Sequence, residues 1–257
     1  MSGIGALLPA GVRQTIDRVR TRRFLARVAA PTAEYVQRNG LEVRRGPFSG
    51  MRYIDGLESS SGDLVAKLAG TYEQELHGVL DGWIAARYPH IIDVGCAEGY
   101  YAVGFAHAIG GATVHAYDID PLARERCAAL AQLNGVGDRV RIQGACEPAG
   151  LGAYPAEGVA LLSDCEGYER TLLDPAAAPA LRGWPILVEL HEFMDASITE
   201  TLRERFGDSH EIDVIEGEGR EREAQLPELG FMSSRQRDAV LGERRPGPMR
   251  WAHLRPR

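Results

Sequence analysis

The sequence predicts an α/β fold with a doubly wound, mostly parallel sheet. From residue 90 onward, short apolar runs typical of buried strands alternate with stretches of helical periodicity. Acidic side chains end several of these runs, where open α/β sheets place their binding sites. Strands that alternate with helices are joined by right-handed crossovers, which give a parallel sheet covered on both faces.

The part before the sheet is expected to differ from the rest. We expect residues 1–88 to form a helical and hairpin extension that covers the site, and residues 89–257 to form the main domain. Periodicity and breakers predict a helix over 11–29 that Pro31 ends, a hairpin over 41–54, and helices over 63–69 and 72–87.

Seven apolar runs define the strands of the main domain. They cover 91–94, 113–117, 139–142, 159–162, 186–190, 211–215 and 249–254. The intervening helices are expected over 99–109, 121–134, 168–182, 196–206 and 233–241. Asp120 before Pro121 is a favourable helix start, because it combines an N-cap with proline in the first turn. The last two strands lack a clear crossover, which is compatible with an antiparallel edge.

The composition is that of a globular protein, and it excludes several chemistries. The 257 residues are 44% hydrophobic and 25% charged. Lys67 is the only lysine beside 28 arginines. A phosphate-binding loop is excluded because no glycine array precedes Lys67, and Schiff-base chemistry is disfavoured because Lys67 lies in a helical stretch.

Charge and apolar runs set expectations about partners and location. The net charge is −7, but residues 1–30 and 235–257 carry +5 each, which leaves −17 between them. Such an acidic centre fits nucleic acid poorly, so we expect no nucleic-acid partner. No apolar run reaches the length of about 18 residues that a membrane span needs, so we expect no membrane association and a cytoplasmic location. The four cysteines form no CxxC pair and are expected to be reduced, without structural zinc.

The strongest chemical feature is the segment from Asp93 to Tyr101. An apolar strand leads into an acid, a small-residue turn and a helix, so that backbone can approach a ligand beside the helix N-terminus. Gly95 and Gly99 are spaced GxxxG, which differs from the GxGxxG of dinucleotide-binding turns. Asp93 would also repel a pyrophosphate and favour an ammonium group. An ordinary tight strand-to-helix turn remains the alternative.

Acidic side chains also follow later strands. Asp118 stands 25 residues after Asp93 and is placed to accept the hydroxyls of a ribose, whereas Asp120 is interpreted as a helix cap. Glu189 and His191 are two residues apart, so their side chains share one face of an extended strand. Beside a carboxylate, His191 can act as a general base. Together with Asp164 the pair could instead hold a divalent metal, or make ordinary polar contacts; we assign no metal.

Together these segments resemble class I S-adenosylmethionine-dependent methyltransferases. Asp93-Val94-Gly95-Cys96-Ala97-Glu98-Gly99-Tyr100-Tyr101 is similar to their first motif. Asp164-Cys165-Glu166-Gly167-Tyr168-Glu169, followed by Glu189-Leu190-His191, resembles the D-x-E-G-x-E and E-x-H signature of the FkbM-type branch. The resemblance covers 90–195 and implies a Rossmann-like, doubly wound seven-stranded sheet, mostly parallel with an antiparallel last strand. It departs from the branch at Cys96 and Ala97, where Ala-Asn is common, which puts the hydrogen bonding of the loop in doubt.

The resemblance implies S-adenosylmethionine as cofactor and S-adenosylhomocysteine as product. The implied cofactor-binding residues are Asp93, Gly95, Cys96, Ala97, Gly99 and Tyr100, then Asp118 at the ribose, Ile119 with Ala145 or Cys146 at the adenine, and Asp164 beside the sulfonium. The candidate catalytic residues are His191, Asp164 and Glu189, of which His191 or Asp164 would take a hydroxyl proton. Tyr72, Glu73 and Glu166 are candidates for the acceptor pocket.

The expected reaction is O-methylation of a hydroxyl on a small molecule, such as a secondary metabolite or a sugar-like compound. N-methylation of a small amine or amino-acid-like acceptor is the alternative, which the acidic centre favours. An NAD-dependent oxidoreductase is disfavoured by the glycine spacing and by Asp93. A non-catalytic cofactor-binding module is a further alternative. The sequence leaves the acceptor and a homodimer open.

Overall fold

The computed structural model describes residues 10–55, 62–217, 226–242 and 249–257. The chain divides into two compact units, each of which is described by itself. The helical unit comprises Met1–Gly40, Glu58–Ala66 and Arg220–Arg244. The sheet unit comprises Leu41–Leu57, Lys67–Gly219 and Arg245–Arg257.

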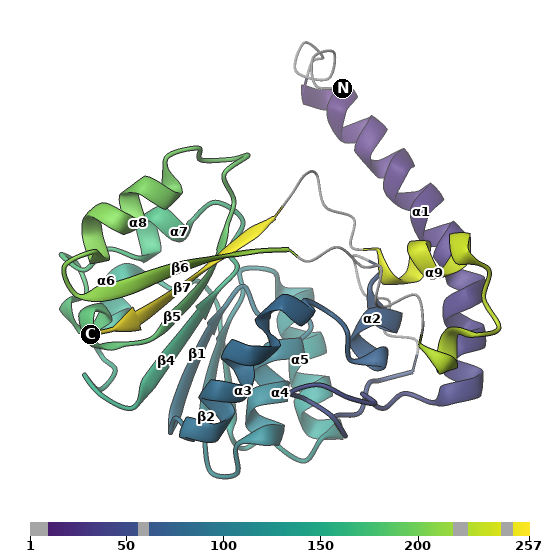
Figure 1. The fold of residues 1–257 in the computed structure, drawn as a ribbon, viewed down its shortest axis with the longest axis horizontal. Helices are drawn as coiled ribbons and strands as arrows, with labels where there is room; N and C mark the ends of the chain where they lie inside the picture. Colours follow the sequence, from purple (N-terminus) through teal and green to yellow (C-terminus); the bar gives the residue numbers. More distant parts are fainter. Residues whose placement is uncertain (1–9, 56–61, 218–225, 243–248) are drawn as a thin grey trace. The chain divides into compact units, whose positions relative to one another are not determined.

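The sheet unit is built on seven strands in the order β3-β2-β1-β4-β5-β7-β6 (Figure 1). They are β1 (His90–Val94), β2 (Thr113–Tyr117), β3 (Val140–Gln143), β4 (Val159–Ser163), β5 (Ile186–Leu190), β6 (His210–Glu216) and β7 (Arg250–Pro256). β1 to β5 pair in parallel, whereas β7 lies between β5 and β6 and is antiparallel to both. The predicted mostly parallel sheet with an antiparallel last strand is therefore confirmed.

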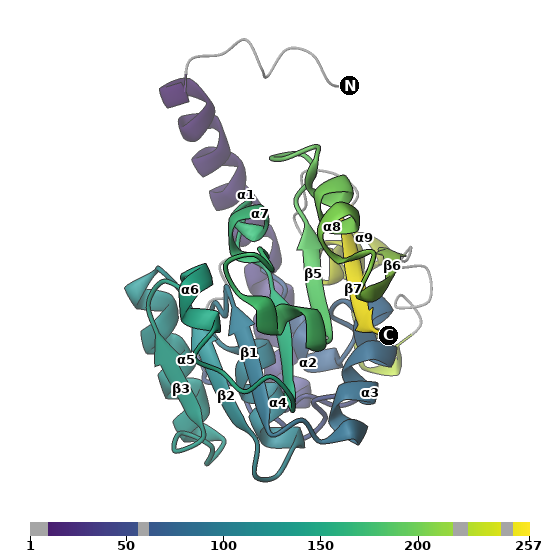
Figure 2. The ribbon, with the colours of Figure 1, turned by 90° about the vertical axis from the view of Figure 1, so that its left-hand side faces the viewer.

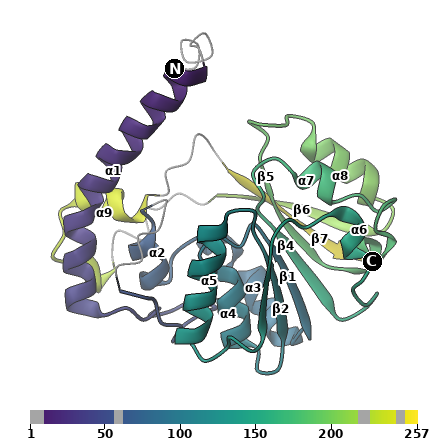
Figure 3. The same cartoon turned by 180° about the vertical axis from the view of Figure 1, so that it is seen from behind.

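Helices cover both faces of this sheet, as the two opposite views in Figures 1 and 3 show. One face carries α3 (His77–Ala86), α4 (Tyr100–Ala108) and α5 (Pro121–Leu133), and the other carries α6 (Pro148–Leu151), α7 (Glu169–Leu172) and α8 (Ile198–Phe206). On the second face, Trp184 and Phe206 are fully buried among strand side chains such as Ile186. Burial of each such large side chain stabilises the fold by about 2–3 kcal/mol.

The prediction of one helix over 168–182 is wrong, because the helix is much shorter. α7 ends at Leu172, and only a 3-10 turn, η3 (Pro179–Gly183), follows. Pro175 and Pro179 explain the interruption, because proline donates no hydrogen bond and disfavours helical backbone in the residue before it.

The helical unit contains α1 (Ala10–Asn39), which runs through Pro31 (Figure 2). The predicted end of this helix at Pro31 is wrong. Val28, Pro31 and Tyr35 are all buried along one face, and α9 (Ser234–Leu241) and the turn η5 (Pro227–Leu229) contact α1. Burial of this face offsets the cost of about 3 kcal/mol that an internal proline imposes.

The segments before β1 do not divide at the expected boundary. Residues 41–57 and 67–88 belong to the sheet unit, and α2 (Leu64–Ala69) is shared between the units. The expected hairpin is reduced to one antiparallel bridge between Glu42 and Arg52. The second expected helix begins with a 3-10 turn, η2 (Gln74–Leu76). That residues 1–88 cover the site stays a prediction. Among the described helices, none is both long and apolar enough to cross a membrane.

Candidate active site

A pocket of about 520 Å³ opens at the carboxyl ends of β1 to β4. Its wall contains eight of the residues singled out in the sequence: Gly95, Ala97, Asp118, Ile119, Ala145, Cys146, Asp164 and Glu166. These residues come from four different strand ends, which parallel pairing brings to one edge of the sheet. Of the other candidates, Asp93, Cys96, Gly99 and Tyr100 do not line this pocket.

The turn after β1 depends on close backbone contact. Gly95 has φ +88°, and a Cβ on it would lie 1.7 Å from the carbonyl oxygen of Asp164, so no side chain fits. Its N–H and that of Cys96 donate to the Tyr117 carbonyl at 2.8 and 3.0 Å. Ala97 adopts φ +46° and donates its N–H to Oδ2 of Asp118 at 2.9 Å. The turn with Cys96 and Ala97 is therefore hydrogen-bonded, because its contacts come from backbone N–H groups and do not depend on these side chains.

Asp118 is held at the pocket wall by its own neighbours. Besides the Ala97 N–H on Oδ2, its Oδ1 accepts the N–H of Asp120 at 2.8 Å. Asp120 in turn accepts the N–H of Leu122, which confirms that it caps α5. A carboxylate fixed in this way presents its remaining lone pairs to the pocket without further loss of side-chain entropy.

Asp93 lies under the same turn in an unusual environment. It is fully buried, and neither carboxylate oxygen makes a hydrogen bond, although the backbone of Ala102 interacts with it weakly. Burial, followed by repulsion from Asp164 and Asp118, raises the pKa of Asp93 to about 8. A positive charge placed near Asp93 would stabilise its ionised form and lower this raised pKa, so the site favours a cationic group.

Replacing Asp93 with asparagine is expected to change how stability depends on pH. An unfolded aspartate loses its proton near pH 3.9, whereas folded Asp93 keeps its proton up to about pH 8. The free energy of unfolding of the wild type should therefore fall as the pH rises between these values. Melting temperatures measured from about pH 5 to about pH 9 should show Asp93→Asn gaining on the wild type up to about pH 8 and levelling off above it. The exposed Asp138→Asn should show no such trend, and a constant offset for Asp93→Asn would contradict the assignment.

A second group of side chains, which we call the reacting edge, consists of Asp164, Glu189 and His191. His191 is 3% exposed, and its Nε2 lies 3.5 Å from Oδ1 of Asp164 and 3.4 Å from Oε2 of Glu189. Asp164 lines the pocket, whereas Glu189 is buried beside it. The structure thus brings together the three residues that the sequence nominated for catalysis.

Glu169 orients the imidazole, a role that the sequence analysis did not assign to it. Its Oε1 lies 2.7 Å from Nδ1 of His191 and also accepts the N–H of Cys165 at 3.1 Å. Because a carboxylate only accepts, Nδ1 carries the hydrogen and Nε2 faces the reacting edge. Burial lowers the pKa of His191, but the Glu169 hydrogen bond and the surrounding carboxylates outweigh it and raise that pKa overall. Glu169 is the last acid of the D-x-E-G-x-E segment, and this position in the motif is the sequence signal that could have identified it.

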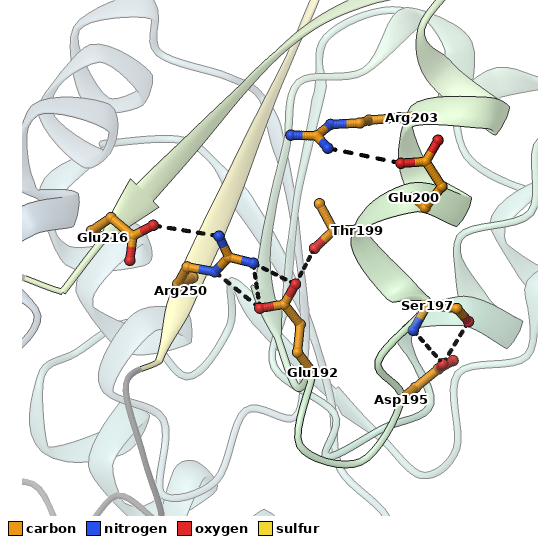
Figure 4. Close-up of polar contacts among 8 residues, drawn as sticks. All are labelled: Glu192, Asp195, Ser197, Thr199, Glu200, Arg203, Glu216 and Arg250. Carbon is orange, nitrogen blue, oxygen red and sulfur yellow. Dashed lines mark hydrogen bonds and ion pairs between the residues drawn. The ribbon is translucent and has the colours of Figure 1, made fainter.

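The turn that follows His191 is anchored on two sides (Figure 4). Nε and Nη2 of Arg250, on β7, donate to the Glu192 carboxylate at 2.9 and 2.5 Å, and the Thr199 hydroxyl of α8 donates to it at 2.6 Å. Asp195 accepts both the N–H and the hydroxyl of Ser197 at 3.0 and 2.7 Å. These contacts fix the backbone that carries His191.

A polar network lies beneath α4. Nζ of Lys67 is 2.5 Å from Oε1 of Glu98, both side chains are buried, and the ammonium lies 4.7 Å from the ring centre of Tyr72. Glu73 has φ +46° and accepts a hydrogen bond from the Tyr101 hydroxyl. Tyr72 and Glu73, which were expected at the acceptor pocket, do not line the pocket described above. They pack against the helix that follows the glycine turn.

The chain shows limited similarity to known proteins. No family model matches the chain. A ribosomal protein L11 methyltransferase of Alkalilimnicola ehrlichii is 40% identical over 65 residues, which are 25% of this chain and 22% of that protein. The matched stretch therefore spans about a fifth of that relative.

Solved structures resemble the chain at low identity. Cofactor-bound Rv0187 from MTB has 16% identity and a TM-score of 0.47, with 73% of this chain and 81% of that chain covered. The O-methyltransferase TomG from Streptomyces achromogenes, in complex with SAM, has 13% identity and a TM-score of 0.47, with 76% and 88% covered. An rRNA methylase from Streptococcus thermophilus has 13% identity and a TM-score of 0.47, with 71% and 96% covered.

Proposed function

We propose that this protein is an S-adenosylmethionine-dependent methyltransferase. The observation that carries the proposal is the pocket at the ends of β1 to β4, whose wall joins the tight turn at Gly95 to the fixed carboxylate of Asp118. The seven-stranded order with an antiparallel β7 agrees with the fold that the sequence motifs imply. The partial match to a named methyltransferase points in the same direction.

The residues present suit this cofactor. Asp118 would accept the ribose hydroxyls, and Ile119, Ala145 and Cys146 would line the adenine. The buried carboxylate of Asp93, with no hydrogen bond of its own, suits a cationic methionine end. Gly95, Cys96, Ala97, Gly99 and Tyr100 would form the turn and helix start beneath it. When bound, the cofactor supplies a methyl group activated by a sulfonium.

We place the acceptor at the reacting edge and propose that it is a small molecule with a hydroxyl group. An O–CH₃ bond forms as the S–CH₃ bond breaks, and sulfur keeps the electron pair of the broken bond. The hydroxyl proton passes to Nε2 of His191 or to the carboxylate of Asp164. Alignment of the acceptor lone pair at about 3–3.5 Å from the methyl carbon accounts for much of the rate in such transfers. Glu166, in the pocket wall, is the candidate for acceptor contact.

N-methylation of an amine is the second candidate. Four carboxylates line the pocket, namely Asp118, Glu147, Asp164 and Glu166, and no lysine or arginine is among its described wall residues. Such a wall attracts a cationic amine and repels phosphate, which also argues against a nucleic-acid acceptor. A FkbM-type role in secondary metabolism rests on the sequence motifs alone.

Binding of S-adenosylhomocysteine tests the proposal directly. We expect the wild type to bind it, and we expect Asp118→Ala to weaken binding about 10- to 100-fold, because one or two charge-assisted hydrogen bonds are lost. Isothermal titration calorimetry measures both affinities, with the exposed Asp138→Ala as control. A thermal shift with NAD but none with S-adenosylhomocysteine would overturn the proposal.

A further inference from the structure

We propose that Asp164, Glu189 and His191 bind a divalent cation, with Mn²⁺ or Zn²⁺ as the ions that fit them best. Each residue offers one ligand atom, and the three atoms lie within 4.8 Å of one another. The sequence left a divalent metal at these residues as one alternative, and no metal was assigned there. The inference comes from how the side chains converge across the ends of β4 and β5.

The distances at Nε2 of His191 suit ligands of one ion better than they suit direct contacts. Nε2 lies 3.5 Å from Asp164 and 3.4 Å from Glu189, which is long for a charge-assisted hydrogen bond. Ligands about 2.1 Å from a tetrahedral ion stand about 3.4 Å apart. The imidazole nitrogen is thus spaced from each carboxylate as two neighbouring ligands of one ion are.

The imidazole is also prepared as a ligand. His191 is 3% exposed, and its other ring nitrogen is fixed by Glu169 at 2.7 Å. This is the carboxylate–histidine pattern that orients metal ligands in proteins and directs the unprotonated nitrogen at the ion. Glu169 is itself held by the Cys165 N–H.

Charge balance favours a dication at this point. Asp164, Glu169 and Glu189 bring three carboxylates to one imidazole, and a protonated His191 contributes one positive charge among them. A bound dication would contribute two and leave the imidazole neutral, in its ligating form. Asp164 is 31% exposed and lines the pocket, so the open side of the cluster faces the place proposed for the acceptor.

The donor set defines the class of ion. Imidazole nitrogen suits Zn²⁺ and other first-row ions, whereas carboxylates suit Mn²⁺ and Mg²⁺, so a mixed set selects Mn²⁺ or Zn²⁺ over Ca²⁺. Such an ion would supply a Lewis acid that lowers the pKa of an acceptor hydroxyl. That use rests on the proposed function, but ion binding itself does not. With the ion bound, His191 would serve as a ligand, and the hydroxyl proton would pass to solvent water at the open side of the site.

Titration of the full chain, stripped of metal, with Mn²⁺ tests the inference. We expect one site per chain by calorimetry, competition by Zn²⁺ and little by Ca²⁺. Glu189→Gln and Asp164→Asn should each weaken Mn²⁺ binding at least about 10-fold, as should Glu169→Gln through its effect on His191. The exposed Glu157→Gln is the matched control and should bind like the wild type.

Circular dichroism, measured on the same samples, reports whether each variant folds. Loss of Mn²⁺ binding with a wild-type circular dichroism spectrum would support the site. Absence of stoichiometric Mn²⁺ and Zn²⁺ binding in the wild type, or equal affinity in the wild type and in Glu189→Gln and Asp164→Asn, would overturn it. A wild type that binds Mn²⁺ but not S-adenosylhomocysteine would instead contradict the proposed function and leave the cation site standing.

Discussion

Replacing His191 with alanine is expected to lower the rate of methyl transfer about 10²- to 10⁴-fold while leaving the affinity for S-adenosylhomocysteine nearly unchanged. Nε2 of His191 faces Asp164 at the pocket, and the residue does not belong to the pocket wall proposed for the cofactor. Single-turnover measurements with labelled methyl cofactor, on an acceptor found by screening hydroxyl and amine compounds, give the rate.

Two variants make this result specific. His107→Ala removes an exposed imidazole and should transfer methyl at the wild-type rate. Glu169→Gln keeps a group of the same shape and should show an intermediate loss, because Glu169 acts by holding the ring at 2.7 Å. A His191→Ala protein that transfers methyl normally would remove His191 from the reaction, whether as proton acceptor or as ligand.

Replacing Lys67 with methionine is expected to lower the free energy of unfolding by about 3–5 kcal/mol, because it leaves Glu98 as an unpaired buried charge. The two side chains are only 5% and 7% exposed and lie 2.5 Å apart. The double variant Lys67→Met/Glu98→Gln removes both charges and should recover much of the loss. Denaturant unfolding followed by circular dichroism measures all three proteins.

An exposed ion pair provides the matched control for Lys67. Arg203 and Glu200 on α8 are 3.8 Å apart and 57% and 68% exposed (Figure 4). Arg203→Met should therefore cost less than about 1 kcal/mol, because solvent screens such pairs. If Lys67→Met and Arg203→Met lowered the free energy of unfolding equally, Lys67→Met would not leave an uncompensated buried charge at Glu98.

The strands and the pocket wall could be predicted because their signals are local. Each strand is a short apolar run, and parallel pairing places residues such as Asp118 and Asp164 at one edge whatever the fine register. A helix cap such as Asp120 is likewise determined by its next two residues. These features need no knowledge of distant packing.

The features that sequence did not predict depend on contacts between distant residues. Lys67 and Glu98 are 31 positions apart, and Glu169 and His191 are 22 apart, so no spacing rule joins them. The continuation of α1 through Pro31 reflects burial of one helix face, which outweighs the local preference of proline. In each case contacts between distant residues decide the outcome, and at Pro31 they do so against the local preference.

The contact between Gly95 and Asp164 limits how this site can change. A methyl group at Gly95 would occupy the position of a backbone carbonyl that no rotamer change can move aside. The glycine turn after β1 and the start of the reacting edge therefore meet through main chain alone, and their spacing cannot be altered by exchanging side chains at this contact. Under the proposed function, relatives that take acceptors of different size would have to vary in the outer residues of the loops after β4 and β5, while this junction stays constant.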